Sequence, residues 1–164
     1  VLGREWQLST IQVDFIQPAR LELTYIGEDG VEHTPVVLHR AVTGATERTM
    51  AVLIEHFAGA FPVWLAPVQA VLIPIADRHV PYMQEVAQKL RAAGLRVEVD
   101  DRGERMNAKI RDAQGKKIPY MLVVGDREMQ EGRLAPRDRT GKTLDSMSPE
   151  EFIRFVQDEC RQYH

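Results

Sequence analysis

The sequence predicts an α/β protein in two parts, and three observations lead to this prediction. Residues 1–65 alternate bulky apolar and polar side chains and then continue into an amphipathic stretch, which is typical of half-buried antiparallel strands followed by a helix. Residues 66–164 alternate short apolar runs with helical patterns, which favours a mixed, mostly parallel sheet flanked by helices. The Pro-punctuated stretch "FPVWLAPVQ" separates the two parts, and we place the boundary after residue 65.

The first part is expected to begin with strands. "WQLSTIQVDF" at 6–15 has the period of two that a strand requires, Pro18 interrupts it, and "LELTYI" at 21–26 resumes it. "GEDG" is a turn, and "PVVLHR" at 35–40 is a further short strand. The helix of this part is expected from residue 46 to about residue 56, where four apolar residues share one face: Met50, Leu53, Ile54 and Phe57.

The second part reads as alternating strands and helices. Strands are expected at 68–75, 95–100 and 118–126, and helices at 79–94, 105–116 and 148–163. Pro81 suits a first helical turn, and Gly94 suits a C-terminal cap. Ser148, Pro149 and Glu151 form the signature of a capped helix start. Between the last strand and the last helix, "GDREMQEGRLAPRDRTGK" at 125–142 is expected to be a basic hairpin.

Composition limits the class of protein. Hydrophobic residues make up 44% of the 164 residues and charged residues 27%, which is typical of a folded globular chain. The net charge of −3 argues against a uniformly basic nucleic-acid binder, although the 125–142 stretch can contact a nucleic acid locally. The single cysteine, Cys160, excludes an internal disulfide, and we expect a cytoplasmic protein without a membrane segment. The chain starts without Met or a secretion signal, and we expect a fragment.

Four stretches, in order along the chain, carry a family resemblance: "GREWQLSTIQVDF", "VVLHRAVTGATER", "FAGAFPVWLAPVQ" and "KIPYMLVVGDRE". Together they resemble the C-terminal part of bacterial-type, class II threonyl-tRNA synthetases. The resemblance implies that 1–65 is the last portion of the catalytic domain and that 66–164 is the anticodon-binding domain. It further implies ATP-dependent activation of threonine, transfer to tRNA(Thr), and a homodimer of the full-length enzyme. The upstream catalytic motifs and editing domains are expected to lie outside this chain, so the isolated chain is expected to be inactive.

The resemblance assigns ATP-facing residues in the first part. Arg48 matches the arginine of the third class II motif, and a permanently charged, forked guanidinium suits the phosphates of ATP, which binds with Mg²⁺. Gln7 and Thr10 are implied on the ATP side and Gln12 on the amino-acid side. Ala45 stands where the family usually has a serine. Spacing alone favours the alternative, an exposed residue in the first turn of a helix, and the resemblance is what favours the ATP contact.

His39 matches a zinc ligand of the family, whose other ligands are expected upstream. Threonine and valine are nearly isosteric, and an apolar pocket separates such a pair by only about 10²-fold. A zinc ion with an open position can bind both the amine and the hydroxyl of threonine, whereas valine lacks the hydroxyl. The alternative is a histidine with an ordinary structural role at the end of a strand.

In the second part the resemblance implies contacts with the tRNA anticodon loop. Glu128 and Arg137 match the family's base-reading pair, and Arg111 and Lys109 match backbone or loop contacts. Gly103 departs from the asparagine that the family often has. Two other classes stay open: a free-standing RNA-binding or regulatory module, and a small α/β ligand-binding domain. Residues 67–164 contain no glycine-rich phosphate loop, which counts against a nucleotide-binding version of the latter.

Overall fold

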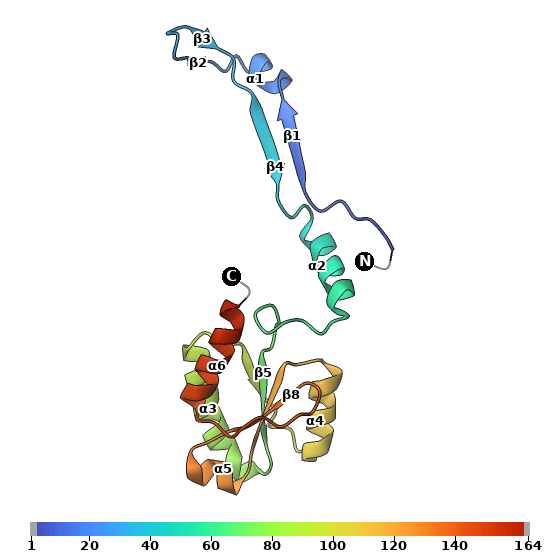
Figure 1. Ribbon diagram of the computed structural model, residues 1–164, viewed down its shortest axis with the longest axis vertical. Coiled ribbons are helices and arrows are strands. Elements are labelled where there is room, and N and C mark those ends of the chain that lie inside the picture. Colours follow the sequence, from blue (N-terminus) through green and yellow to red (C-terminus); the bar gives the residue numbers. More distant parts are fainter. Residues whose placement is uncertain (1–2, 163–164) are drawn as a thin grey trace. The chain divides into compact units, whose positions relative to one another are not determined.

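The computed structural model describes residues 3–162 and divides the chain into two compact units, Val1–Ala58 and Gly59–His164 (Figure 1). Unit 1 contains two short antiparallel strand pairs. Strand β1 (Thr10–Asp14) pairs with β4 (Val37–Ala41), and β2 (Tyr25–Ile26) pairs with β3 (Glu32–His33). Helix α2 (Thr46–Phe57) follows β4 and agrees closely with the predicted helix.

The predicted strand at 6–15 is too long. Only residues 10–14 are strand, and a short helix α1 (Ile16–Arg20) replaces the interruption expected at Pro18. The Asp14 carboxylate accepts hydrogen bonds from the backbone N–H groups of Ile16 and Gln17, both at 2.9 Å, and these bonds start the helix. Pro18 is tolerated there because the first turn of a helix needs no N–H donor. The predicted strand at 21–26 is likewise reduced to its last two residues.

Apolar side chains of the β1–β4 pair are exposed. Ile11, Val13 and Leu38 are each more than half exposed, and Pro18 is the only buried residue among those described in unit 1. Both hydrophobic core clusters lie in unit 2. Burial of apolar surface is the main driving force of folding. Unit 1 has strands and helices but buries almost no apolar surface among its described residues.

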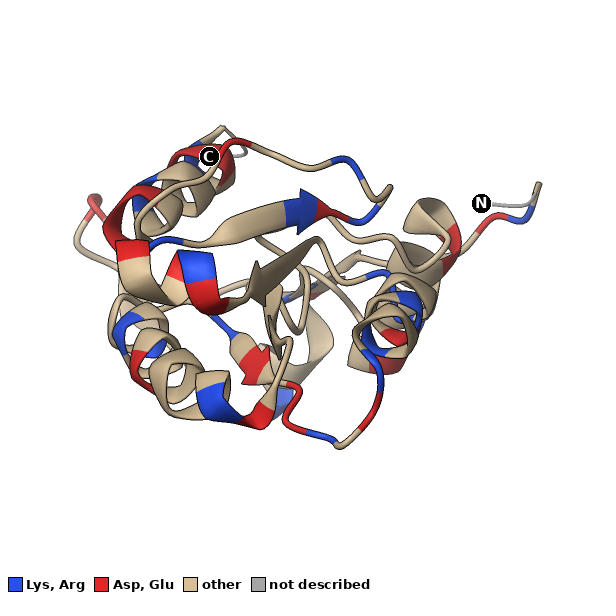
Figure 2. Ribbon diagram, turned by 90° about the horizontal axis from the view of Figure 1, so that it is seen from below, with Lys and Arg blue, Asp and Glu red and all other residues tan. Residues whose placement is uncertain are grey.

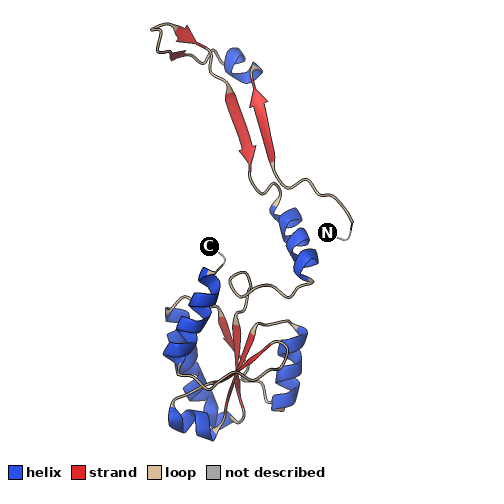
Figure 3. Cartoon of the chain, in the orientation of Figure 1, coloured by secondary structure: helices blue, strands red, loops and turns tan. Residues whose placement is uncertain are grey.

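Unit 2 has one four-stranded sheet in the order β6-β5-β7-β8. Strands β5 (Ala70–Pro74), β6 (Val97–Val99) and β7 (Tyr120–Val124) are parallel, and β8 (Ala135–Asp138) is antiparallel to β7. The helical elements are η1 (Asp77–His79), α3 (Val80–Ala92), α4 (Met106–Gly115), α5 (Asp126–Glu131) and α6 (Pro149–Arg161). Figure 3 shows helices on both sides of this sheet. The predicted α/β class with a mostly parallel, helix-flanked sheet is confirmed.

The two faces of the sheet have separate cores. Leu72 and Leu122 pack toward α3 and α6, where Phe152 is fully buried. Ile73 and Met121 face α4. The predicted cap of the last helix is present: the Ser148 hydroxyl accepts the Glu151 N–H at 3.1 Å, and the Glu151 carboxylate accepts the Ser148 N–H at 2.7 Å.

The expected hairpin at 125–142 is wrong in its first half. Residues 126–131 form α5, and only 135–138 form a strand. The Glu128 carboxylate accepts the Gly125 N–H and so caps α5, and Gly132 ends the helix with a φ of +65°, a conformation that glycine adopts without strain. In the part of the chain that the structure describes, no helix is both long and apolar enough to span a bilayer.

Candidate functional site

One face of the β1–β4 pair gathers three residues with predicted roles: Gln12 on the amino-acid side, Thr10 on the ATP side and His39 as a zinc ligand. Gln12 lies directly opposite His39, and Thr10 lies opposite Ala41. Because residues two apart on a strand share a face, Thr10, Gln12 and Asp14 are on the same side as His39. Gln12, Asp14 and His39 border a shallow cavity of about 320 Å³.

Asp14 was not predicted as a site residue. Its Oδ2 lies 3.2 Å from Nε2 of His39. The pKa of this carboxyl is lowered, chiefly by the hydrogen bond from the Gln17 N–H and also by the contact with His39. The sequence does carry a signal for it, because Asp14 is two residues after Gln12 and the period of two of a strand puts both on one face. An ionised carboxylate beside an imidazole orients the ring and fixes which ring nitrogen is left for another partner.

Arg48 contacts the segment that carries Gln7. Its Nη1 donates a hydrogen bond of 2.8 Å to the backbone carbonyl of Gln7, although Gln7 itself lies before β1 rather than within it. Gly44 lies in the turn before α2 with a φ of +61°, and a Cβ there would come within 2.4 Å of the Leu8 carbonyl oxygen. The turn and the segment before β1 are therefore in close backbone contact, and Arg48 joins them.

Within residues 3–162 there is no group of three or more His, Cys, Asp or Glu side chains arranged to hold a metal ion. His39 and Asp14 form a pair only. Zinc binding by His39 stays a prediction that depends on ligands other than those described.

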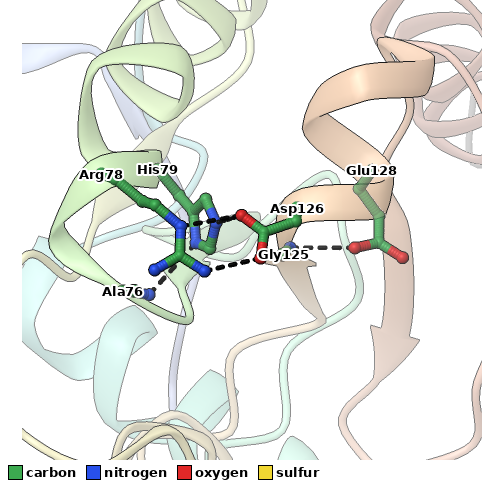
Figure 4. Close-up of polar contacts among 6 residues, drawn as sticks. All are labelled: Ala76, Arg78, His79, Gly125, Asp126 and Glu128. Carbon is green, nitrogen blue, oxygen red and sulfur yellow. Dashed lines mark hydrogen bonds and ion pairs between the residues drawn. The ribbon is translucent and has the colours of Figure 1, made fainter.

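In unit 2, Glu128 is held at the start of α5 (Figure 4). Its Oε2 accepts the Gly125 N–H at 2.9 Å, and the side chain is partly exposed. Gly125 directly follows β7, so Glu128 lies at the carboxyl edge of the parallel strands, where α/β sheets place their ligands. A carboxylate bound through one oxygen can accept a further hydrogen bond from a base through the other.

Figure 4 also shows a polar cluster that was missed by sequence reasoning. Asp126 binds Arg78 through two contacts, Nε to Oδ1 at 2.8 Å and Nη2 to Oδ2 at 2.5 Å. Asp126 Oδ1 also lies 2.9 Å from Nε2 of His79, a side chain that is only 1% exposed. We call Arg78, His79 and Asp126 the Asp126 cluster.

Arg137 lies on β8 opposite Met121, and cross-strand partners share a face, so Arg137 is on the α4 side of the sheet. It is partly buried, and its Nε is buried without a hydrogen-bond partner among the described residues. Arg111, on α4, is exposed. Arg111 can therefore present its donors to solvent on this side of unit 2, whereas Arg137 keeps a buried donor without a partner among the described residues.

Lys109 does not share this exposure. Only 5% of the residue is exposed, and its Nζ donates a hydrogen bond of 2.9 Å to the Asp100 carbonyl. This position argues against the predicted RNA contact and favours a structural role in joining α4 to the end of β6. Gly103 borders a polar cavity of about 230 Å³ near the same strand ends. Figure 2 shows Lys and Arg interspersed with Asp and Glu on the unit 2 helices rather than collected in one basic face.

Comparison with known proteins finds two family models that match this chain. Residues 69–159 match the family model "Anticodon binding domain", and residues 1–57 match "tRNA synthetase class II core domain (G, H, P, S and T)". The chain is similar to threonine–tRNA ligases of Syntrophotalea carbinolica (59% identity over 99% of this chain) and Rubrobacter xylanophilus (61% over 97%). It spans about a quarter of the length of each, 25% in both cases.

A solved structure is also similar. The crystal structure of the RNA binding domain of threonyl-tRNA synthetase from Cryptosporidium parvum Iowa II aligns with a TM-score of 0.87 and 34% identity. The alignment covers 96% of this chain and 40% of that one.

Proposed function

The chain belongs to the anticodon-binding domain family, its relatives confirm the predicted resemblance to threonyl-tRNA synthetases, and on this premise we propose that it is part of a threonine–tRNA ligase. The whole protein would activate threonine with ATP and transfer it to tRNA(Thr). Residues 66–164 would recognise the anticodon, and residues 1–65 would supply part of the catalytic pocket. We propose that the full-length enzyme acts in the cytoplasm as a homodimer.

The observation that carries the anticodon proposal is the position of Glu128 and Arg137. Glu128 lies at the carboxyl edge of the sheet with one carboxylate oxygen bound to the backbone, and Arg137 lies on the face that α4 flanks. Unpaired anticodon bases expose their hydrogen-bonding edges. The carboxylate would accept hydrogen bonds from base amino or imino groups, and the guanidinium would donate two to one edge. Arg111 would contact the backbone of the loop, where an exposed cation suffices.

In unit 1 the proposal is supported by the contact between Arg48 and the Gln7 carbonyl. Formation of the adenylate requires no protein nucleophile, because the threonine carboxylate attacks the α-phosphate of ATP directly. The protein therefore contributes orientation and positive charge. Arg48 would bind ATP, which carries Mg²⁺, with Gln7 and Thr10 lining the same side and Gln12 facing threonine.

The exposed apolar residues of the β1–β4 pair support a role as part of a larger catalytic domain. Ile11, Val13 and Leu38 require cover in a stable soluble enzyme, and unit 1 has no buried core of its own among the described residues. We propose that other segments of the synthetase core cover them. The chain alone is therefore expected to be inactive.

The environment of His39 fits a zinc ligand. With Asp14 beside Nε2, the ring leaves Nδ1 as the nitrogen that can face a metal, and metal-binding histidines commonly have a carboxylate partner of this kind. We propose that His39 contributes one ligand and that the others come from outside the described residues. A bound zinc would supply an open position for the amine and hydroxyl of threonine. Gln12, directly opposite, would help to orient the substrate.

The test of anticodon recognition compares two RNAs on the same protein. Binding of the chain to the tRNA(Thr) anticodon stem–loop is measured beside a stem–loop with exchanged anticodon bases. Glu128→Ala should reduce the ratio of the two affinities at least about fivefold, which corresponds to the lower range for one specific base contact. Glu131→Gln, on the same helix, is the control. An unchanged ratio for Glu128→Ala contradicts the assignment.

Catalysis is tested separately. The chain alone should show no threonine-dependent exchange of pyrophosphate into ATP, and such exchange would contradict the proposed incompleteness of the pocket. The full-length protein should show it, and Arg48→Ala should reduce it at least about 10²-fold, as expected when a cation facing transition-state charge is removed. An inactive full-length protein with intact, anticodon-specific binding would instead support the alternative of an RNA-binding or regulatory module.

A further inference from the structure

The Asp126 cluster connects two loops that leave neighbouring strands. Arg78 and His79 follow β5, and Asp126 follows β7, its hydrogen-bonding partner in the sheet. The Ile75 N–H donates to the Val124 carbonyl at 3.0 Å and extends the pairing just beyond the strands. The Asp126 cluster therefore fixes the point at which the loop after β5 and the loop after β7 leave the sheet.

The imidazole of His79 has both nitrogens engaged. Nδ1 accepts the backbone N–H of Ala76 at 3.1 Å, so Nε2 carries the proton and donates to Asp126. His79 is almost fully buried, whereas Arg78 and Asp126 are 63% and 55% exposed. An exposed ion pair alone contributes little, but a buried donor must keep its acceptor. His79 therefore holds Asp126 more firmly than the surface pair with Arg78 would alone.

Asp126 is the first residue of α5, and Glu128 is two residues further in the same turn. Glu128 is bound to the Gly125 N–H, immediately before Asp126. The backbone that determines the position of the Glu128 carboxylate is thus held on one side by β7 and on the other by the Asp126 cluster. The hydrogen bond from Arg78, and after it the hydrogen bond from His79, hold the pKa of the Asp126 carboxyl well below its usual range. Asp126 is therefore ionised at neutral pH and available as the acceptor for both side chains.

We propose that His79 and Asp126 are positioning residues for base discrimination: by fixing the start of α5 they hold the Glu128 carboxylate where it meets a base. This inference rests on the proposed role of Glu128 in anticodon recognition. A base contact needs the acceptor to be placed within hydrogen-bonding distance and angle, and a shift of the helix start would remove that geometry without removing Glu128 itself.

The experiment is a double-mutant cycle on the whole chain with the same two stem–loops. Asp126→Ala should lower the ratio of affinities about as much as Glu128→Ala does, at least about fivefold. The double variant should be no worse than Glu128→Ala alone, because both changes remove the same contact. Glu131→Gln, which also removes one negative charge and an exposed ion pair of α5, should leave the ratio unchanged.

Two variants of His79 separate positioning from general loss of structure. His79→Gln keeps a donor that can reach Asp126, and the ratio of the two stem–loop affinities should stay at its original value. His79→Leu keeps an apolar side chain of similar volume without a donor, and this ratio should fall. Thermal unfolding followed by circular dichroism confirms that each variant is folded. If His79→Leu fails to fold, the Asp126 and Glu128 cycle decides by itself.

The outcomes are distinct. If Glu128→Ala lowers the ratio but Asp126→Ala leaves it unchanged, or the two losses multiply in the double variant, the positioning role is refuted while the proposed function stands. If Glu128→Ala itself changes nothing, both the base-reading role and the positioning role are refuted.

Discussion

Replacing Lys109 with methionine tests whether this lysine supports the fold or contacts RNA. Methionine keeps most of the apolar stem but removes the donor to the Asp100 carbonyl, which lies 2.9 Å from Nζ. A hydrogen bond from a charged donor contributes about 1.5–3 kcal/mol. Since Lys109 is 95% buried, water cannot readily replace it, and we expect a loss of about 2 kcal/mol in the free energy of unfolding. For a unit of this size that lowers Tm by roughly 10 °C.

The assay combines thermal unfolding with RNA binding at several salt concentrations. If Lys109 is structural, Tm falls and the slope of log affinity against log salt stays the same. Arg111→Met is the matched control: it removes an exposed cation from the same helix, should leave Tm unchanged, and should reduce the slope by about 0.7 if Arg111 neutralises one phosphate. An unchanged Tm for Lys109→Met together with a reduced slope would refute the structural role.

Three further predictions concern stability. Asp126 has a lowered pKa in the folded state, so its stabilisation is present above the ordinary value of 3.8 and is lost as pH falls below it. In urea titrations at several pH values, the free energy of unfolding of Asp126→Asn should therefore fall less on acidification than that of the original chain. An unaltered pH profile would contradict this. Ser148→Ala should lower the free energy of unfolding by about 1 kcal/mol in the same assay, because it removes a helix cap, and a change near zero would show that the cap contributes nothing. Gly44→Ala should increase hydrogen exchange in unit 1, because the added Cβ would meet the Leu8 carbonyl oxygen at 2.4 Å; unaltered exchange would count against that close approach.

Elements with a strong local pattern could be predicted from the sequence, and elements set by individual side chains could not. The apolar runs of β5 and β7 and the capped start of α6 lie within two residues of their expected positions. The first strand was overextended because alternation continues from Trp6 although the pairing partner β4 reaches only Thr10. Strand pairing is a long-range property, so alternation alone does not fix where a strand begins.

Residue types at the site were easier to predict than their partners. The resemblance gave Glu128, but its role in capping α5 depends on a helix that the basic composition of 125–142 concealed. His79 and Asp126 are 47 residues apart, and no periodic pattern relates them. Their contact arises because β5 and β7 are adjacent and parallel, which brings the loops after both strands to one edge.

For Lys109 and Arg111, helical geometry in the sequence does carry the missing information. Met106, Ile110 and Ala113 recur at the spacing of one helical face, and all three pack against the sheet. Lys109 is three residues after Met106 and four before Ala113, so it lies within that face. Arg111 is two residues further, a rotation of about 200° around the helix, and therefore points away from the sheet. A cation inside an apolar helix face is expected to bind a backbone acceptor, whereas a cation on the opposite face can contact a phosphate. Lys109 and Arg111 carry the same charge, and their positions around the helix therefore distinguish their roles.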